Sequence, residues 1–560
     1  MTKLYEALAE AFLAEGVDTQ FALMGDGNMH WSTTFARLPG VQTIHVRHEH
    51  CAVAAATAYN VATGNIAAAS VTCGPGVTQL VTALPAAVRA RLPMVVFAGE
   101  PPINAKFYNQ YIDQVPLVTA TGAHYIAAHS VPRMMDYVRE AFHIAKYERR
   151  PVVLGIPYDL QKLDSTSNQP YETSAVYYPK VGRIHPDPAI VAEVVDRLIA
   201  AKRPIIIGGR GVLYAGAKAA VVKLADRCGA LLANTLPTRG LFHDHEFSVG
   251  IPGSYFTTLG REVFETAEVV LAIGTSLSYY VGGGHYSPRP AGSRWTRRRA
   301  VFATGRRPPI SMSRRMRWSP RRRSSRASTR SSGPASRRRL RSAPRSWRAG
   351  SRLSPLTPRP STSSPVCSIR ARRYAPSTAQ SRRIGTSSAA PATRPLGSRN
   401  CAAGRPSGSR RSASLVRVGN GLSYALGVAA ARRQGRDGKL VLIEGDGGLL
   451  FHIQELETVR RHGMRMLICV MNDGGYGSEF HKLRADGIDD SQAIFGRPAF
   501  ENIARGFGLR GHEIRDVSII PKLFANFSAQ GESEIWNIQI SDKVTAPAIR
   551  QTIKRGHGKL

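Results

Sequence analysis

The sequence predicts an α/β protein of three units, each built around a parallel sheet with helices on both faces. Short apolar runs of strand length recur over residues 1–290 and again after 418, separated by stretches long enough for a helix. Such runs are typical of parallel strands that are buried on both faces. The 560 residues exceed what one hydrophobic core holds and fit about three domains. The pattern is absent between the second and third units.

The first unit is predicted to span residues 1–165. It opens with an amphipathic helix, because Leu4, Leu8 and Phe12 recur at helical spacing among acidic residues. That pattern describes a folded helix rather than a signal or transit peptide. Its predicted strands are the apolar runs 19–25, 65–74, 94–100 and 151–157.

The other two units follow the same pattern. The second is predicted to span 186–290, with strands in 203–212, 230–236 and 267–277. The third is predicted to span 418–560, with its clearest strands in 439–447 and 466–475. Each unit is therefore expected to be Rossmann-like, with strands and helices in alternation.

Residues 291–417 have a different composition. They hold 33 Arg and 27 Ser, without Lys, Asp or Glu, and these arginines account for 33 of the 37 net positive charges of the chain. A disordered linker is one interpretation, since such a composition does not offset the entropy of folding. Out-of-frame translation of GC-rich DNA between two compensating frame changes explains both the composition and its abrupt borders, and we favour it. An RNA-binding insert is a third interpretation, which the absence of Lys disfavours.

Charge and cysteine usage limit the class of protein. Outside 291–417 the charge is close to balanced, so a nucleic-acid partner is not expected for the folded units. The six Cys are scattered without a C-x-x-C pair, which supports neither a disulfide framework nor a zinc site. No uncharged apolar run reaches the roughly 18 residues of a membrane span. We expect a cytoplasmic protein without a membrane partner.

The strongest motif lies in the third unit, at residues 445–477. Gly445, Asp446 and Gly447 follow an apolar run, and a second apolar run ends at Asn472 and Asp473. Two parallel strands joined by one crossover end at the same edge of a sheet, where ligands bind in such folds. Carboxylate and carbonyl oxygens at that edge suit Mg²⁺, and glycines let a diphosphate approach the backbone.

This motif resembles the cofactor motif of thiamine diphosphate (ThDP) enzymes, a family that includes acetolactate synthase and the 2-oxo acid decarboxylases. The resemblance assigns the metal to Asp446, Asp473 and the carbonyl of Gly475, with Asp473 standing where the family more often has Asn. The further cofactor-binding residues that it implies in this unit are Val418, Gly445, Gly447, Gly448, Asn472 and Tyr476. Val418 occupies the place of the large apolar residue that holds the cofactor bent.

The second motif surrounds Glu49. On composition alone, Glu49 between His48 and His50 is compatible with either a metal cluster or a satisfied helix N-terminus. The resemblance favours a third role, because in the family a glutamic acid at this place hydrogen-bonds the aminopyrimidine ring of the cofactor. A carboxylic acid buried in an apolar site holds a proton there, which prepares the thiazolium for attack on a 2-oxo acid.

Weaker matches complete the predicted site. Gly25 lies in a loop that resembles the glycine loop near the substrate, and Gly74 and Pro75 match a turn near the pyrimidine ring. Gln110 resembles a glutamine that lines the active site. The histidines His30, His48 and His50 are candidate proton donors, although a single histidine is more often structural.

The resemblance covers about 1–286 and 419–560 and implies pyrimidine-binding, middle and diphosphate-binding units in that order. ThDP and Mg²⁺ are the expected cofactors, a small 2-oxo acid the substrate, and a homodimer or homotetramer the assembly, since the family binds its cofactor between two chains. We expect an acetolactate synthase-like reaction. The alternatives are a 2-oxo acid decarboxylase and a non-catalytic protein whose basic segment binds nucleic acid. FAD, which some synthases hold through the middle unit, stays undecided.

Overall fold

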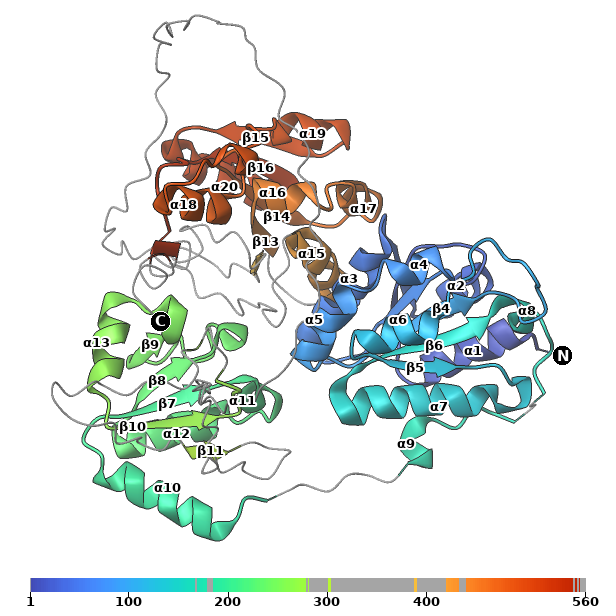
Figure 1. Ribbon diagram of the computed structural model, residues 1–560, viewed down its shortest axis with the longest axis horizontal. Coiled ribbons are helices and arrows are strands. Elements are labelled where there is room, and N and C mark those ends of the chain that lie inside the picture. Colours follow the sequence, from blue (N-terminus) through green and yellow to red (C-terminus); the bar gives the residue numbers. More distant parts are fainter. Residues whose placement is uncertain are drawn as a thin grey trace, which may run out of the picture. The chain divides into compact units, whose positions relative to one another are not determined.

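A computed structural model of the chain describes residues 2–166, 169–178, 185–277, 281, 301–303, 387–389, 419–432, 440–546, 549–550 and 553. Three parallel sheets organise these residues, as the sequence predicts, and each sheet is flanked by helices (Figure 1).

The first sheet has six parallel strands in the order β2-β1-β3-β4-β6-β5. Its strands are β1 (Thr19–Ala22), β2 (Gln42–His45), β3 (Ala68–Val71), β4 (Met94–Glu100), β5 (His124–Ala127) and β6 (Pro151–Pro157). The helices around it are α1 (Leu4–Ala14), α2 (Met29–Arg37), α3 (Glu49–Thr63), α4 (Pro75–Thr78), α5 (Ala83–Ala90), α6 (Gln114–Ala120), α7 (Met134–Ile144), α8 (Tyr158–Gln161) and α9 (Ser174–Tyr177).

The central strand β4 shows why these runs are apolar throughout. Val96 and Ala98 pack in one buried cluster with α3 and α5, whereas Val95 and Phe97 pack in another with α1, α2 and α7. Successive side chains of a strand point to opposite faces, so a strand with both faces covered is apolar at most of its positions. In the predicted first helix, Leu4, Leu8 and Phe12 are buried.

The second sheet has five parallel strands in the order β11-β10-β7-β8-β9. They are β7 (Pro204–Gly208), β8 (Leu231–Asn234), β9 (Ser248–Gly250), β10 (Val269–Ile273) and β11 (Val301–Ala303), with α10 (Pro188–Ala200), α11 (Arg210–Tyr214), α12 (Lys218–Cys228) and α13 (Thr258–Thr266). Two buried clusters, one containing residues of α10 and α12 and one containing residues of α13, cover its two faces.

The third sheet has five parallel strands in the order β12-β13-β14-β16-β15. They are β12 (Ser387–Ala389), β13 (Leu440–Gly445), β14 (Met466–Asn472), β15 (Arg510–Ile514) and β16 (Glu534–Gln539). The helices are α15 (Asn420–Arg432), α16 (Asp446–Leu450), α17 (Glu455–Arg461), α18 (Gly477–Ala485), α19 (Phe500–Gly506) and α20 (Ile520–Gln530). Residues of α15, α17 and α19 pack on one face, and α20 packs on the other.

Two short strands lie in the Arg/Ser-rich segment. The segment 291–417 has no strand or helix periodicity, and β11 and β12 fall inside it and pair with β10 and β13. A three-residue edge strand is held by backbone hydrogen bonds, which need no apolar periodicity in the sequence. The rest of that segment lies outside the described residues.

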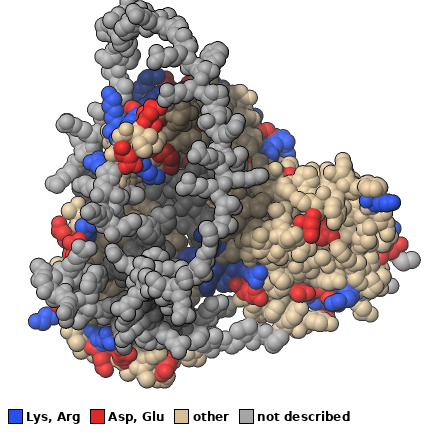
Figure 2. Space-filling model, in the orientation of Figure 1, with Lys and Arg blue, Asp and Glu red and all other residues tan. Residues whose placement is uncertain are grey.

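Two surface properties follow from the described residues. Acidic and basic side chains are interspersed over the described surface in view in Figure 2, in agreement with the near balance of charge outside 291–417. Among the described helices, none is both long and apolar enough to cross a membrane.

Candidate cofactor and active site

Glu49 is the first residue of α3, immediately after the N-cap residue His48. The imidazole Nδ1 of His48 accepts a hydrogen bond from the backbone N–H of His50 at 3.1 Å, which fixes the start of the helix. Burial raises the pKa of the Glu49 carboxyl above its ordinary value. A β-carbon placed on Gly76 would lie 3.6 Å from Oε1 of Glu49. A carboxyl group that stays neutral more readily thus faces the turn formed by residues 74–76.

That turn brings three predicted residues together. Gly74 has φ +53°, and a β-carbon on it would lie only 1.8 Å from the carbonyl oxygen of Gln110. The thiol of Cys73 also contacts the side-chain oxygen of Gln110 at 3.3 Å. A side chain at Gly74 would therefore clash with the segment that carries Gln110. Pro75 follows as the first residue of α4.

The glycine loop meets the same place through Thr72. The backbone N–H of Gly27 donates to Oγ1 of Thr72 at 3.1 Å, and a β-carbon on Gly25 would lie 2.7 Å from Cβ of Thr72. Both loops follow the carboxyl ends of neighbouring strands, β1 and β3. His30 lies one turn away in α2, where burial lowers its pKa.

In the third unit, Asp446 and Asp473 follow the ends of the paired strands β13 and β14. The carboxylate of Asp446 accepts hydrogen bonds of 2.8 Å from the backbone N–H groups of Gly447 and Gly474. Burial raises the pKa of Asp446 to about 6. Burial, and then repulsion from Asp446, raises the pKa of Asp473 to about 7. The two carboxylates therefore interact, as expected for residues that follow two parallel strands joined by one crossover.

The donor set at this edge fits Mg²⁺. Two carboxylates lie beside Gly475, whose carbonyl accepts one hydrogen bond from Gly477 N–H at 3.1 Å and has a second lone pair. Hard oxygen donors of this kind, completed by phosphate and water, are what Mg²⁺ requires. A divalent cation would also relieve the repulsion that raises the pKa of Asp473. The residues present thus fit a metal that holds a diphosphate.

The remaining predicted residues of this unit fall into two groups. A β-carbon on Gly447 would lie 2.9 Å from the ring of Tyr476, so these two residues meet, and Gly448 follows in α16. The side chain of Asn472 instead points into the unit, where its amide donates to Pro498 and Asn537 at 3.1 and 2.9 Å. Val418 lies outside the described residues.

Contacts within the chain link the first and third units near α3. The backbone N–H of Arg47 donates to Glu455 at 2.9 Å, and its guanidinium pairs with Glu457 at 2.6 Å. Nε2 of His50 contacts Oδ1 of Asn420 at 2.7 Å, and its ring stacks on His452 at 5.0 Å between centroids. These contacts bring the Glu49 end of α3 beside the segment that follows Asp446.

Three buried residues of this region were not predicted. Glu444 accepts hydrogen bonds from the backbone N–H groups of Gly421 and Leu422 at 3.1 Å, and burial raises its pKa to about 7. The only charge within the apolar run 440–445 is a signal that could have singled it out. His452 and Gln114 gave no such signal, because their partners are distant in sequence.

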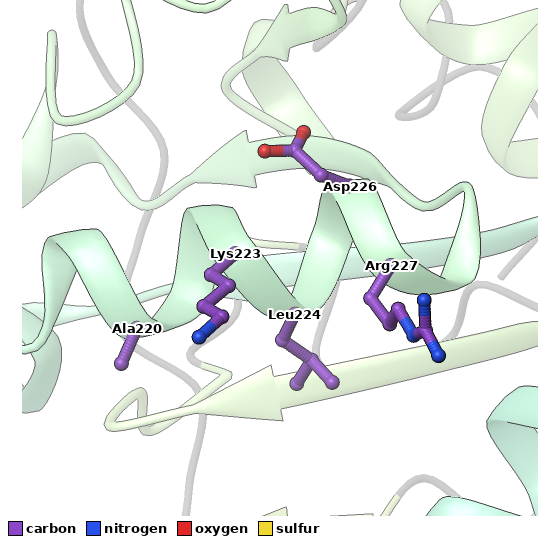
Figure 3. A pocket seen from close by; sticks show the side chains of 5 residues that line it. All are labelled: Ala220, Lys223, Leu224, Asp226 and Arg227. Atoms are coloured by element: carbon purple, nitrogen blue, oxygen red, sulfur yellow. The ribbon is translucent and has the colours of Figure 1, made fainter.

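A hollow on the middle unit has a different character. It is lined by five residues of α12 alone, Ala220, Lys223, Leu224, Asp226 and Arg227, and Figure 3 shows Asp226 pointing away from the other side chains. Asp226 is engaged by His245 at 2.8 Å. One exposed helix face does not enclose a ligand, so the hollow gives no support for FAD.

The three parallel sheets, each with helices on both faces, define an α/β protein of the doubly wound type. The chain belongs to the thiamine pyrophosphate enzyme family. The N-terminal TPP binding domain of that family matches residues 2–124, the central domain residues 191–294 and the C-terminal TPP binding domain residues 397–532.

Curated relatives are acetolactate synthases and a carboligase at modest identity. The chain is similar to the acetolactate synthase large subunit of Parasynechococcus marenigrum, with 27% identity over 537 residues, covering 92% of this chain and 84% of the relative. It is 28% identical to glyoxylate carboligase of Escherichia coli O157:H7 over 271 residues, covering 46% of this chain and 44% of the relative. The chain spans about half the length of most of these relatives.

A solved structure shares the fold. A protein from Mycobacterium smegmatis, described as thiamin diphosphate-dependent, superposes with a TM-score of 0.68 over 96% of this chain and 100% of that chain, at 18% identity. The likeness supports the three-unit architecture.

Proposed function

We propose that the protein uses ThDP and Mg²⁺ to remove CO₂ from a small 2-oxo acid and to join the remaining fragment to a second carbonyl compound. The observation that carries the proposal is that one chain holds both a half-buried Glu49, whose pKa is raised, and the carboxylate pair Asp446 and Asp473. The names of the relatives, acetolactate synthase and glyoxylate carboligase, favour joining over simple decarboxylation.

When bound, ThDP supplies the thiazolium carbon that attacks the substrate and the electron sink for loss of CO₂. Glu49 holds a proton towards the aminopyrimidine ring, because burial favours its neutral form. Asp446, Asp473 and the Gly475 carbonyl hold Mg²⁺ against the diphosphate.

The polar residues beside Glu49 orient this end of the site. The side-chain oxygen of Gln110 is engaged by the Cys73 thiol, which holds that segment over the turn. His48 and His50 are each engaged by a neighbour, His50 N–H and Asn420 respectively, so their first role is to orient the Glu49 end of α3.

We propose a homodimer or homotetramer as the working assembly. Large apolar side chains are exposed on the segment that crosses the Gly74 turn: Ile103, Phe107, Tyr111 and Val115 are 49%, 89%, 72% and 44% exposed. Phe451, at the end of α16, and Phe495, next to Gly447, are 45% and 40% exposed. A second copy that covers these surfaces would remove them from water. The described cysteines are all free thiols, which supports a cytoplasmic location.

The proposal predicts that ThDP and Mg²⁺ together raise the melting temperature, whereas each alone has a smaller effect.

Glu49→Gln is expected to lower turnover of a 2-oxo acid by at least about 100-fold while cofactor binding stays within a few-fold, because the amide cannot hold the proton. Glu10→Gln, an exposed change in the same unit, is the matched control. Full turnover by Glu49→Gln would refute the mechanism, and protonated product without joined product would assign a decarboxylase instead.

A further inference from the structure

A continuous chain of hydrogen bonds runs behind the Gly74 turn. The backbone N–H of Gly74 donates to Oε1 of Gln114 at 2.7 Å. The amide of Gln114 donates to the carbonyl of Gly99 at 3.2 Å and to the hydroxyl of Tyr125 at 2.9 Å. The Tyr125 hydroxyl donates to Glu100, whose other oxygen contacts His129. The chain thus links the ends of β4 and β5 to the turn that follows β3.

Gln114 is suited to this place by its chemistry. It is 4% exposed, and its one acceptor and two donors are all engaged. A glutamate would offer no donor to Gly99 or Tyr125, and an apolar side chain would leave the Gly74 N–H without its acceptor. Burial of an unpaired backbone N–H is costly, so the position of the turn depends on this side chain.

The turn lies between Gln114 and Glu49. On one side Gln114 holds Gly74, and on the other side Glu49 faces Gly76 within van der Waals distance. Gly74 has φ +53° and no room for a side chain, so its backbone packs directly against the segment that carries Gln110. A shift of the Gly74 end therefore moves the backbone against which Glu49 lies.

We propose that Gln114 is a positioning residue, which sets the Gly74–Gly76 backbone against the aminopyrimidine ring of bound ThDP through the anchor Tyr125–Glu100. The inference rests on the proposed function. It assigns a role in cofactor binding to a side chain that touches neither Glu49 nor the acidic pair in the described contacts.

The first unit offers a matched control. Gln20 is also fully buried, and its amide group is also engaged three times, by Ser32 O at 2.8 Å, Thr43 Oγ1 at 2.9 Å and Ser32 Oγ at 3.0 Å. It lies on β1 and does not contact the turn. Gln20→Met and Gln114→Met therefore remove the same kind of buried amide with the same side-chain volume, and only the second removes the acceptor of Gly74.

The test measures the dissociation constant of ThDP in the presence of Mg²⁺ on the full chain, together with the melting temperature of each variant without cofactor. Gln114→Met is expected to weaken ThDP binding by about tenfold, whereas Gln20→Met changes it by less than about twofold despite a comparable drop in melting temperature. Tyr125→Phe, which keeps the ring, is expected to weaken binding in the same direction. In the double variant, the loss of ThDP binding free energy should be smaller than the sum of the losses in Tyr125→Phe and Gln114→Met, because both residues act through one network.

The outcomes separate the two claims. An unchanged dissociation constant in both Gln114→Met and Tyr125→Phe overturns the positioning role and leaves the proposed function intact. Equal weakening by Gln20→Met also overturns it, because the effect then reports general loss of packing. Absence of ThDP binding by the unaltered chain overturns the proposed function itself, and the positioning role with it.

Discussion

Asp473 changes the electrostatics of the acidic pair at residue scale. An amide at this position would leave one charge near the metal, whereas Asp473 adds a second carboxylate whose pKa is raised to about 7 by burial and by repulsion from Asp446. The folded-state pKa of both carboxyls exceeds the value of 3.8 expected in the unfolded chain. The neutral acids are therefore favoured in the folded protein. The stabilisation that results is complete below about pH 4 and is lost as the pH rises through about 7.

The metal-free protein is accordingly expected to melt a few degrees lower at about pH 8 than at about pH 5. Mg²⁺ with ThDP should raise the melting temperature more at the higher pH, because the carboxylates must be ionised to bind the cation.

Asp473→Asn is expected to flatten the pH dependence of the melting temperature of the metal-free protein. Asp486→Asn, an exposed change in the same unit, should leave it as it is. Thermal melts at both pH values decide this, and an unaltered pH dependence in Asp473→Asn would rule out the repulsion.

Residues of the candidate site were predictable where a local motif carries them. Glu49, Asp446 and Asp473 each stand in a short sequence pattern that begins at the end of a strand, so their neighbourhood follows from the topology of a parallel sheet. Gln114 and His452 were not predictable, because their partners Gly74 and His50 are brought to them only by the packing of separate elements. Asn472 shows the converse: it belongs to the motif, yet its amide packs inwards.

The contact of α3 with α15 is the clearest case at the scale of elements. A β-carbon on Gly427 of α15 would lie 2.0 Å from the carbonyl oxygen of Ala55 in α3, so the two helices touch through backbone. Cys51 and Ser423 make a 3.1 Å contact one turn earlier, and both helices begin at the candidate site. Separation of the helices would therefore also displace the Glu49 end of α3.

Gly427→Ala is expected to destabilise the protein by about 1–3 kcal/mol, since the added methyl group must force the helices apart. Gly506→Ala is the control: Gly506 ends α19, has no atom within 4 Å of an added β-carbon, and should lose nothing in stability. Urea unfolding of both variants measures the difference. Equal stability of Gly427→Ala and the unaltered chain would contradict this packing.

The elements themselves were mostly predictable because burial on both faces makes a strand apolar along its whole length. Strands such as β4, β6 and β14 coincide with the runs 94–100, 151–157 and 466–475. The strands β11 and β12 were not predictable, since three edge residues held through their backbone carry no pattern. The interior strand β16 was not predicted either, because the buried polar residues Glu534 and Asn537 interrupt its apolar pattern.

At the scale of the whole molecule, the exposed apolar segment around Phe107 predicts self-association. Phe107→Asp is expected to shift the proposed dimer or tetramer towards monomer, because a charge in a buried interface lacks a partner. Phe247→Asp, which alters an exposed phenylalanine of the middle unit, should leave the mass unchanged. Analytical ultracentrifugation with ThDP and Mg²⁺ distinguishes the two. A monomeric unaltered chain under these conditions would overturn the proposed assembly.

The borders of the segment 291–417 carry the last prediction. The central-domain match ends at 294, close to where the Arg/Ser-rich composition starts, whereas the C-terminal match begins at 397, inside the segment. Compensating frame changes explain the break between the two matches, because they leave the flanking sequence in register. We therefore expect that resequencing of codons 286–418, translated in all three frames, yields a mixed-charge stretch with an apolar strand in a shifted frame.

The rival interpretation makes the opposite prediction for the same segment. If the 33 arginines were selected for phosphate contacts, the chain would bind RNA or DNA with an affinity that falls steeply with salt. If no reading frame of codons 286–418 encodes an ordinary mixed-charge stretch, and the chain shows such binding, the frame-change hypothesis is wrong and the nucleic-acid-binding interpretation replaces it. Recovery of an ordinary stretch would instead supply the end of the middle unit that follows β10 and the wall of the diphosphate site ahead of Gly419. The chain with the corrected segment should then bind ThDP more tightly than the chain with the Arg/Ser-rich segment. Parallel titrations of both chains with ThDP in the presence of Mg²⁺ measure the difference.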